Sequence, residues 1–205
     1  MTFMQELRQQ RWDDHRYYHH NRVNQTLHLV SATCFLGSYV LLFVSPAAAV
    51  FVGWVLAMVT RQVGHFVFEP QTYDEVNQAT HEYKESVKVG YNLQRKVVLL
   101  TVWIAAPFAL YLDPTLFGWL GASRTFWDNL ALVWLVIGLA AVLARTAQLC
   151  LAKGVQSGVV WCTKILTDPL HDIMIYYKAP YYLLKGDMYD DMSEWYDDSV
   201  RVSVA

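Results

Sequence analysis

Apolar runs separated by short polar segments dominate this chain of 205 residues. A helix that crosses a bilayer needs about 20 predominantly apolar residues, and four runs approach this length. Basic residues beside the runs can reach the lipid interface and extend the shorter ones; they are Arg22, Arg61, Lys96 and Arg145. The pattern therefore predicts four membrane-spanning helices, over residues 26–44, 46–68, 97–112 and 130–150.

The composition favours the same fold class. The chain is 55% hydrophobic and only 17% charged, which is low for a soluble protein that must cover its surface with polar groups. A soluble bundle with buried core helices is the alternative, but few polar residues are left to cover four apolar helices. We expect an all-α integral membrane bundle that forms one domain over residues 1–205. The net charge of -2 and the absence of a basic patch exclude a nucleic-acid partner.

Prolines and aromatic residues set the expected details. Pro107 should kink or locally break the third run. Residues 151–205 are rich in tyrosine and tryptophan, which suit the headgroup level of a membrane. We expect this region to lie at the interface, broken into short helices by Pro169 and Pro180.

Lysine and arginine placement predicts the topology. These residues gather before the first run, between the second and third, and after the fourth, while the other two connections hold only Arg124. By the positive-inside rule, both termini and the middle loop should be cytoplasmic. The charged N-terminal segment is not a cleavable signal peptide, so the first run should be a retained anchor. No retention signal is visible, which favours a bacterial inner membrane.

Histidines recur at helical spacing beside other polar residues. Residues four apart lie one turn apart on the same face of a helix. Three such stripes occur: His20, Asn24 and His28; Arg61, His65 and Glu69; and Asn77, His81 and Glu85. The expected topology brings these histidines, with His19 and His171, to the cytoplasmic face, where they can converge on one site.

The chemistry of imidazole points to a metal. Imidazole suits iron, zinc and copper, and two histidines with a carboxylate are typical of non-haem iron oxygenases. Glu69 could ligate the metal or orient the ring of His65, and Asn24 is better suited to orienting. His19 points about 100° away from His20 on a helix, so only one of the two need face the site. The cysteines, Cys34, Cys150 and Cys162, lack metal-knuckle spacing.

Two separated motifs resemble one enzyme family. The first comprises residues 18–21 with Asn24 and His28, and the second comprises residues 62–69 with His65 and Glu69. They resemble the paired motifs of the membrane-bound 2-hydroxy fatty acid dioxygenases, which include a yeast enzyme of phytosphingosine breakdown and bacterial relatives. The resemblance covers roughly the first half of the chain.

The resemblance implies an Fe(II) enzyme that uses O2 to remove one carbon from a 2-hydroxy fatty acid, the reaction of fatty acid alpha-oxidation. His20, His28 and His65 would be its functional histidines, supported by Asn24 and Glu69. Topology and spacing add two further candidate metal ligands, His81 and His171. The candidates for attracting the substrate carboxylate are Arg22, Arg61 and Lys84.

Three alternatives remain open at this point. A membrane cytochrome would hold haem between histidines on facing helices. A membrane di-iron hydroxylase or desaturase would bind two metals and use more histidines. A non-enzymatic membrane scaffold would need no metal and would tolerate replacement of His20 or His65.

Overall fold

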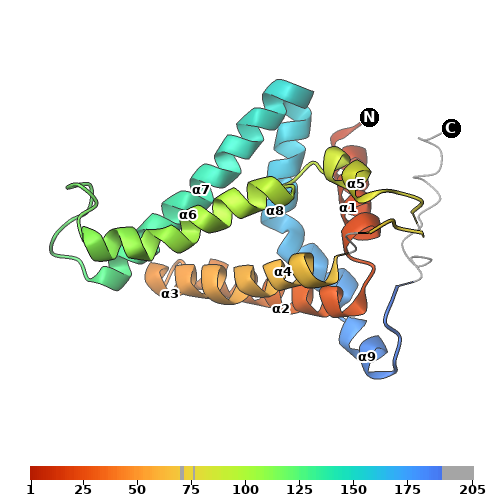
Figure 1. The fold of residues 1–205 in the computed structure, drawn as a ribbon, viewed down its shortest axis with the longest axis horizontal. Helices are drawn as coiled ribbons and strands as arrows, with labels where there is room; N and C mark the ends of the chain where they lie inside the picture. The colour runs from red at the N-terminus through yellow and green to blue at the C-terminus, as the bar shows by residue number, and fades with distance from the viewer. Residues whose placement is uncertain (70–71, 76, 191–205) are drawn as a thin grey trace.

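The computed structural model describes residues 1–69, 72–75 and 77–190, and these residues are helical or form short connections (Figure 1). The extended pairings among them are isolated bridges, such as Asn21 with Tyr189. The all-α fold class is therefore confirmed for the described part of the chain. Of the expected interfacial region, residues 191–205 lie outside the described residues.

The helices follow one another with few long gaps. In chain order they are α1 (Phe3–Tyr18), α2 (Arg22–Leu41), α3 (Pro46–Phe51), η1 (Val52–Ala57), α4 (Met58–Val63), η2 (Gly64–Phe68), α5 (His81–Val87), α6 (Leu93–Leu112), α7 (Phe126–Lys153), α8 (Val155–Tyr176) and α9 (Ala179–Leu184).

Elements α3, η1, α4 and η2 form one uninterrupted helix, Pro46–Phe68, with the bounds expected from the sequence. Its start is encoded locally. The hydroxyl of Ser45 accepts a hydrogen bond from the backbone N–H of Ala48, and Pro46 occupies the first turn, where its missing N–H costs nothing. The segments η1 and η2 are π-helical. Such wider turns are rare and frequently occur at functional sites.

Three helices in the described part of the chain are long and apolar enough to cross a membrane: Pro46–Phe68, Leu93–Leu112 and Phe126–Lys153. They support three of the four expected spans, and α2, which covers most of the expected first span, is not among these three. The reason is visible in its interior face. Asn24, Gln25, His28 and Ser31 are all fully buried, and these polar side chains lower the hydropathy of α2.

Two of the prolines do not break their helices. α6 continues through Pro107, and α8 continues through Pro169 for a total of 22 residues. A proline removes one backbone hydrogen bond and strains the preceding turn, but helix packing can hold the chain helical. The predicted break at Pro169 is therefore wrong, whereas Pro180 does lie in the first turn of a new short helix, α9.

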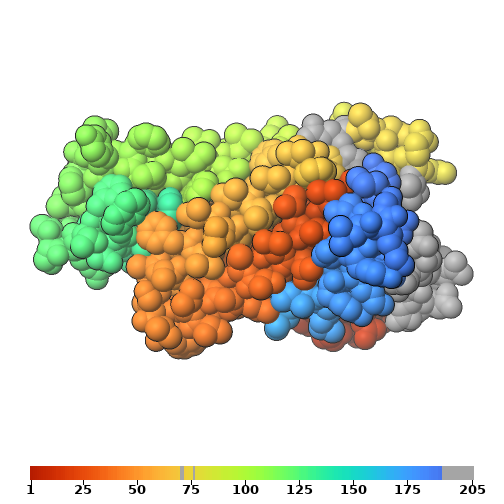
Figure 2. Space-filling model, turned by 90° about the horizontal axis from the view of Figure 1, so that it is seen from below, coloured from red at the N-terminus to blue at the C-terminus, as the bar shows by residue number. Residues whose placement is uncertain are grey.

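The long helices pair as two hairpins (Figure 1). α2 packs along the Pro46–Phe68 helix, and both views show the two side by side (Figure 2). α6 packs along α7, and the two hairpins meet near their connections. Where the two hairpins meet, the core is apolar and includes Val50, Trp54, Ala106, Leu110, Leu130, Ala131 and Trp134.

Polar contacts gather at the opposite end of the hairpins, where α1 packs against α8. The Lys164 ammonium on α8 lies 2.6 Å from an Asp14 oxygen on α1 and 2.7 Å from an Asp168 oxygen. The N-terminal part of α2 and the end of Pro46–Phe68 meet beneath α1. Arg22 at the start of α2 and Lys96 on the first turn of α6 lie near this end. Which side of a membrane it faces stays a prediction.

A glycine sets the spacing between α2 and η2 at this end. A Cβ atom on Gly64 would overlap the side-chain oxygen of Asn24 and would lie 3.4 Å from Cδ2 of His28. The Asn24 amide cannot easily withdraw, because it is fully buried and its Nδ2 donates to the carbonyl of Tyr18 at 2.7 Å. Gly64 therefore allows the close approach that brings α2 and η2 together.

We predict that Gly64→Ala destabilises the protein by about 1–3 kcal/mol, the usual cost of overfilling a packed interior. Thermal unfolding in detergent, followed by circular dichroism, measures the effect. Gly37→Ala is the matched control, because Gly37 lies on the same helix pair and a Cβ atom added to it would have no other side chain within 4 Å. That control should unfold at an equal or higher temperature, since alanine favours helix. Equal behaviour of the two variants would contradict the packing role.

Candidate metal centre

Three histidines from three elements meet at the polar end of the hairpins. His19 follows α1, His28 lies on α2 and His65 lies on η2. One ring nitrogen from each lies within 4.8 Å of the others. The ring centroids are 4.0 Å apart for His19 and His28, 4.9 Å for His28 and His65, and 5.2 Å for His19 and His65. This three-histidine cluster could hold a metal ion.

Two amide side chains from α2 fix the backbone at His19. Nδ2 of Asn24 donates to the carbonyl of Tyr18 at 2.7 Å, and Nε2 of Gln25 donates to the carbonyl of His19 at 2.8 Å. Both amides are fully buried. These bonds hold the carbonyls on either side of the His19 α-carbon, so α2 positions a histidine that belongs to a different element.

His20 is not part of the three-histidine cluster. The sequence analysis expected His20 beside His28 and His65, but the structure has His19 at this position. The reason is a break in the helix. α1 ends at Tyr18, and α2 begins at Arg22 after Asn21, whose side chain caps it. His20 therefore does not share a helical stripe with Asn24 and His28. Its ring lies 5.9 Å from that of Tyr189, and its carbonyl accepts a hydrogen bond from the backbone of Asp190 at 2.7 Å.

The cluster contains buried nitrogens without hydrogen-bond partners. Within the part of the chain that the structure describes, Nε2 of His19 and both ring nitrogens of His28 lack one. Burial, reinforced by the neighbouring His28, keeps the pKa of His19 well below its usual range, so this ring is neutral at physiological pH. Buried polar atoms in native proteins are almost always satisfied. Neutral imidazoles with free lone pairs are the ligands that a transition metal needs.

Glu69 orients His65. Nδ1 of His65 donates to the Glu69 carboxylate at 2.8 Å, which leaves Nε2 of the neutral ring without a proton and able to bind a metal. The second oxygen of Glu69 accepts a hydrogen bond from the Lys88 ammonium at 3.2 Å. A carboxylate behind a metal-binding histidine fixes its tautomer and raises its basicity. The geometry therefore favours Glu69 as the residue that orients the ring of His65, and not as a metal ligand.

Asp172 is the carboxylate nearest to His28. One of its oxygens lies 3.6 Å from Nδ1 of His28 and 3.0 Å from the guanidinium of Arg61. Burial raises the pKa of Asp172, although the Arg61 charge opposes the shift. The contact with His28 is too long for a hydrogen bond, so Asp172 is held by Arg61 beside the cluster.

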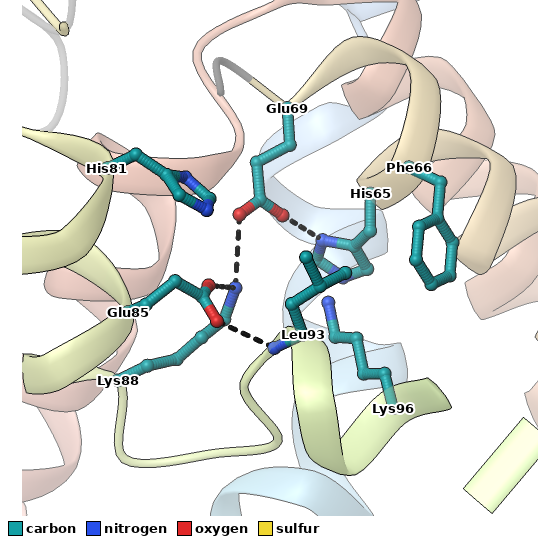
Figure 3. A pocket seen from close by; sticks show the side chains of 8 residues that line it. All are labelled: His65, Phe66, Glu69, His81, Glu85, Lys88, Leu93 and Lys96. Atoms are coloured by element: carbon teal, nitrogen blue, oxygen red, sulfur yellow. Dashed lines mark hydrogen bonds and ion pairs between the residues drawn. The ribbon is translucent and has the colours of Figure 1, made fainter. Parts of the chain in front are cut away.

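Two open cavities flank the three-histidine cluster. The first is a small pocket on the His65 side of the cluster (Figure 3). It is bounded by η2, α5 and the start of α6, with the lining residues His65, Phe66, Glu69, His81, Glu85, Lys88, Leu93 and Lys96. The second is a small pocket on the His19 side, between α1 and α8, and its lining includes His171 and Tyr176.

His81 and His171 therefore lie near the cluster without belonging to it. His81 lines the first cavity across from Glu69 (Figure 3). It stands at the first position of α5, which Thr80 caps, so Asn77 is not on its helix and the third predicted stripe is interrupted. His171 lines the second cavity on the other side of the cluster. The two histidines lie in different cavities.

Tyr176 is a site residue that the sequence analysis did not find. Its ring lies 6.1 Å from His19 and 6.3 Å from His28, and its hydroxyl lies 3.1 Å from Nδ1 of His15. Burial raises the pKa of Tyr176 well above its usual value, so it remains a neutral phenol. Nothing in the local pattern of α8 points to this role, because the contacts join residues more than a hundred positions apart.

Residues 5–77 match the family model described as 2-hydroxy-palmitic acid dioxygenase Mpo1-like. Over these residues, which we call the Mpo1-like segment, the chain is similar to that family. The match confirms the family suspected from the two motifs, and it contains all of the three-histidine cluster as well as Asn24 and Glu69. The remaining helices, α5 to α9, lie beyond this Mpo1-like segment. No curated protein and no solved structure matches the chain.

We predict that the metal-free protein loses stability in mild acid. Burial lowers the pKa of His15 from about 6.5 to about 4, so the unfolded chain binds a proton there before the folded chain does. The free energy of unfolding should fall as the pH drops from about 6.5 to about 4, by on the order of 3 kcal/mol from this group. Thermal unfolding across this range measures it. In the His15→Gln variant, whose side chain cannot titrate, the free energy of unfolding should fall less over this pH range. An equal fall in the variant and the wild type would show that groups other than His15 cause the loss.

Proposed function

We propose that this protein is an Fe(II)-dependent dioxygenase that removes one carbon from 2-hydroxy fatty acids at a membrane. The observation that carries the proposal is the three-histidine cluster, which lies wholly within the Mpo1-like segment. The family description names a 2-hydroxy-palmitic acid dioxygenase. Three apolar helices long enough to span a bilayer fit a substrate with a long acyl chain.

In this proposal His19, His28 and His65 hold the metal, and Glu69 keeps His65 in the required tautomer. Asn24 and Gln25 contribute by holding the backbone on both sides of His19. Three histidine ligands leave coordination positions for other molecules. Bound there, Fe(II) would supply O2 activation and polarise the oxygens of the substrate.

The reaction is balanced without a further reductant. One 2-hydroxy acid and one O2 are equivalent in atoms and electrons to a fatty acid one carbon shorter, carbon dioxide and water. The bond that breaks joins the carboxyl carbon to the carbon bearing the hydroxyl. The protein has to bind the acid end beside the cluster and to keep water from the buried rings, and the burial of His19 and His28 serves the second need.

The geometry favours this proposal over its rivals. Two axial histidines of a haem face each other across the porphyrin, whereas His19, His28 and His65 contact one another directly. A di-iron enzyme would use a second set of ligands. Among the described residues, this cluster alone brings three metal-binding side chains close enough to share an ion, which favours one metal per chain.

We predict that the two adjacent histidines behave differently. Iron content of anaerobically prepared, iron-supplemented protein should be near one per chain for the wild type and for His20→Ala. It should fall to background for His19→Ala, His28→Ala and His65→Ala, because each removes a ligand. Elemental analysis measures the iron, and O2-dependent conversion of 2-hydroxypalmitate to the acid one carbon shorter measures the activity.

The pair His19→Ala and His20→Ala is a matched control, since both remove an imidazole from the same connection. Loss of iron in His20→Ala but not in His19→Ala would show that His20, and not His19, is the metal ligand. Absence of iron and of product in the wild type would defeat the dioxygenase proposal itself.

We predict that Glu69→Gln lowers the affinity for iron about 10- to 100-fold, the usual effect of losing the carboxylate behind a ligand histidine. Titration against a competing chelator measures it. Glu85→Gln is the control. Glu85 lines the same cavity, but its carboxylate accepts a hydrogen bond from the backbone of Leu93 and pairs with Lys88 instead of with His65. Equal losses in both variants would show that cavity charge, and not orientation of His65, is responsible.

A further inference from the structure

One buried cation beside the cluster lacks a partner in the described part of the chain. Buried charges are costly unless an opposite charge or hydrogen bonds compensate them. Three other buried cations are compensated: Lys84 lies 3.5 Å from Asp74, Arg145 donates to the carbonyl of Val89 at 3.1 Å, and Lys164 lies 2.6 Å from Asp14. Lys96 is only 9% exposed, and no acceptor among the described residues binds its ammonium.

Lys96 lies on the first turn of α6 and lines the cavity beside His65. Figure 3 shows its ammonium end directed to the His65 side of the cavity. The two carboxylates of the cavity are engaged elsewhere. Glu69 binds His65 and Lys88, and Glu85 accepts from the backbone N–H of Leu93 at 2.6 Å. Both carboxylates also pair with the ammonium of Lys88, which lies 3.6 Å from Glu85. No carboxylate among the described residues is therefore within ion-pair distance of the Lys96 ammonium, and an anionic ligand can take that place.

We propose that Lys96 binds the carboxylate of the acyl substrate. This inference rests on the proposed function and identifies the residue that recognises the acid end. Charge-assisted hydrogen bonds to a carboxylate are among the strongest that proteins make. The basic residues favoured by the sequence are already occupied, since Arg22 lies 3.0 Å from Asp190 and Arg61 lies 3.0 Å from Asp172.

The surroundings of Lys96 suit an acyl chain. Phe66 and Leu93 provide apolar walls to the cavity. Beyond it, Val67 on η2 and Val97 on α6 are 65% and 50% exposed. These residues belong to two of the helices that could span a membrane. A fatty acid whose carboxylate binds Lys96 would thus have its reacting end beside His65 and its tail against apolar helix surface.

Equilibrium binding to the full chain in lipid nanodiscs tests the proposal. The probes are radiolabelled 2-hydroxypalmitate and the uncharged analogue hexadecane-1,2-diol, both with metal-free protein. Lys96→Met should weaken binding of the acid about tenfold or more, as expected for a lost charged hydrogen bond. The affinity of the same variant for the diol should differ from that of the wild type by less than about twofold. Lys96→Arg, which keeps the charge, should retain the preference for the acid.

Lys153→Met is the matched control, because Lys153 is an exposed lysine at the end of another apolar helix, α7. It should bind both probes as the wild type does. Thermal unfolding of each variant checks folding, and replacement of an uncompensated buried charge by methionine should not lower the unfolding temperature.

Two results would overturn the assignment of Lys96. One is a wild type that does not prefer the acid to the diol, and the other is a Lys96→Met variant that binds the acid normally or loses both probes equally. The dioxygenase proposal fails separately. Wild type without iron or product, but with a preference for the acid that depends on Lys96, would leave the carboxylate site standing. A Lys96→Met enzyme with unchanged acid binding and turnover would remove the carboxylate site alone.

Discussion

The structure depends on the packing of three imidazole rings, two of them buried, where α1, α2 and η2 meet. Buried nitrogens without hydrogen bonds are unfavourable, and His19 and His28 carry such atoms within the described residues. Residues around the three rings hold them in these positions. Gly64 lets η2 approach α2, Asn24 and Gln25 hold the backbone at His19, and Glu69 fixes His65. A bound cation would turn this unfavourable packing into a stabilised one, since metal binding and folding share their free energy.

The same requirement explains why α2 differs from the other long helices. A helix with polar residues on its inner face cannot be as apolar as one that presents only apolar groups. α2 buries Asn24, Gln25, His28 and Ser31, and Ser31 donates to the carbonyl of Ala57 on the neighbouring helix at 2.8 Å. Packing along Pro46–Phe68 covers this polar face. The hairpin thus buries the polar side chains of α2 that belong to the site.

Local signals explain which parts of the site could be predicted from the sequence. Apolar length and the Ser45–Pro46 start identified the Pro46–Phe68 helix, and helical spacing identified the pair His65 and Glu69. The break between α1 and α2 was missed, although Asn21 is a favoured capping residue, and His20 was therefore chosen in place of His19. Tyr176 and Asp172 could not be found by any local pattern, because only the packing of α8 brings them to the cluster.

The Mpo1-like match and the geometry divide the site into two parts. All three clustered histidines, and the groups that orient them, lie within residues 5–77. The first cavity is bounded by α5 and α6, which lie outside this segment and contribute Glu85 and Lys96, and by Lys88 directly after α5. An imidazole cluster defines which metal and which chemistry are accessible, whereas the cavity wall defines which molecule reaches it. In the function proposed above, recognition of the substrate would therefore depend on helices that the family match does not include.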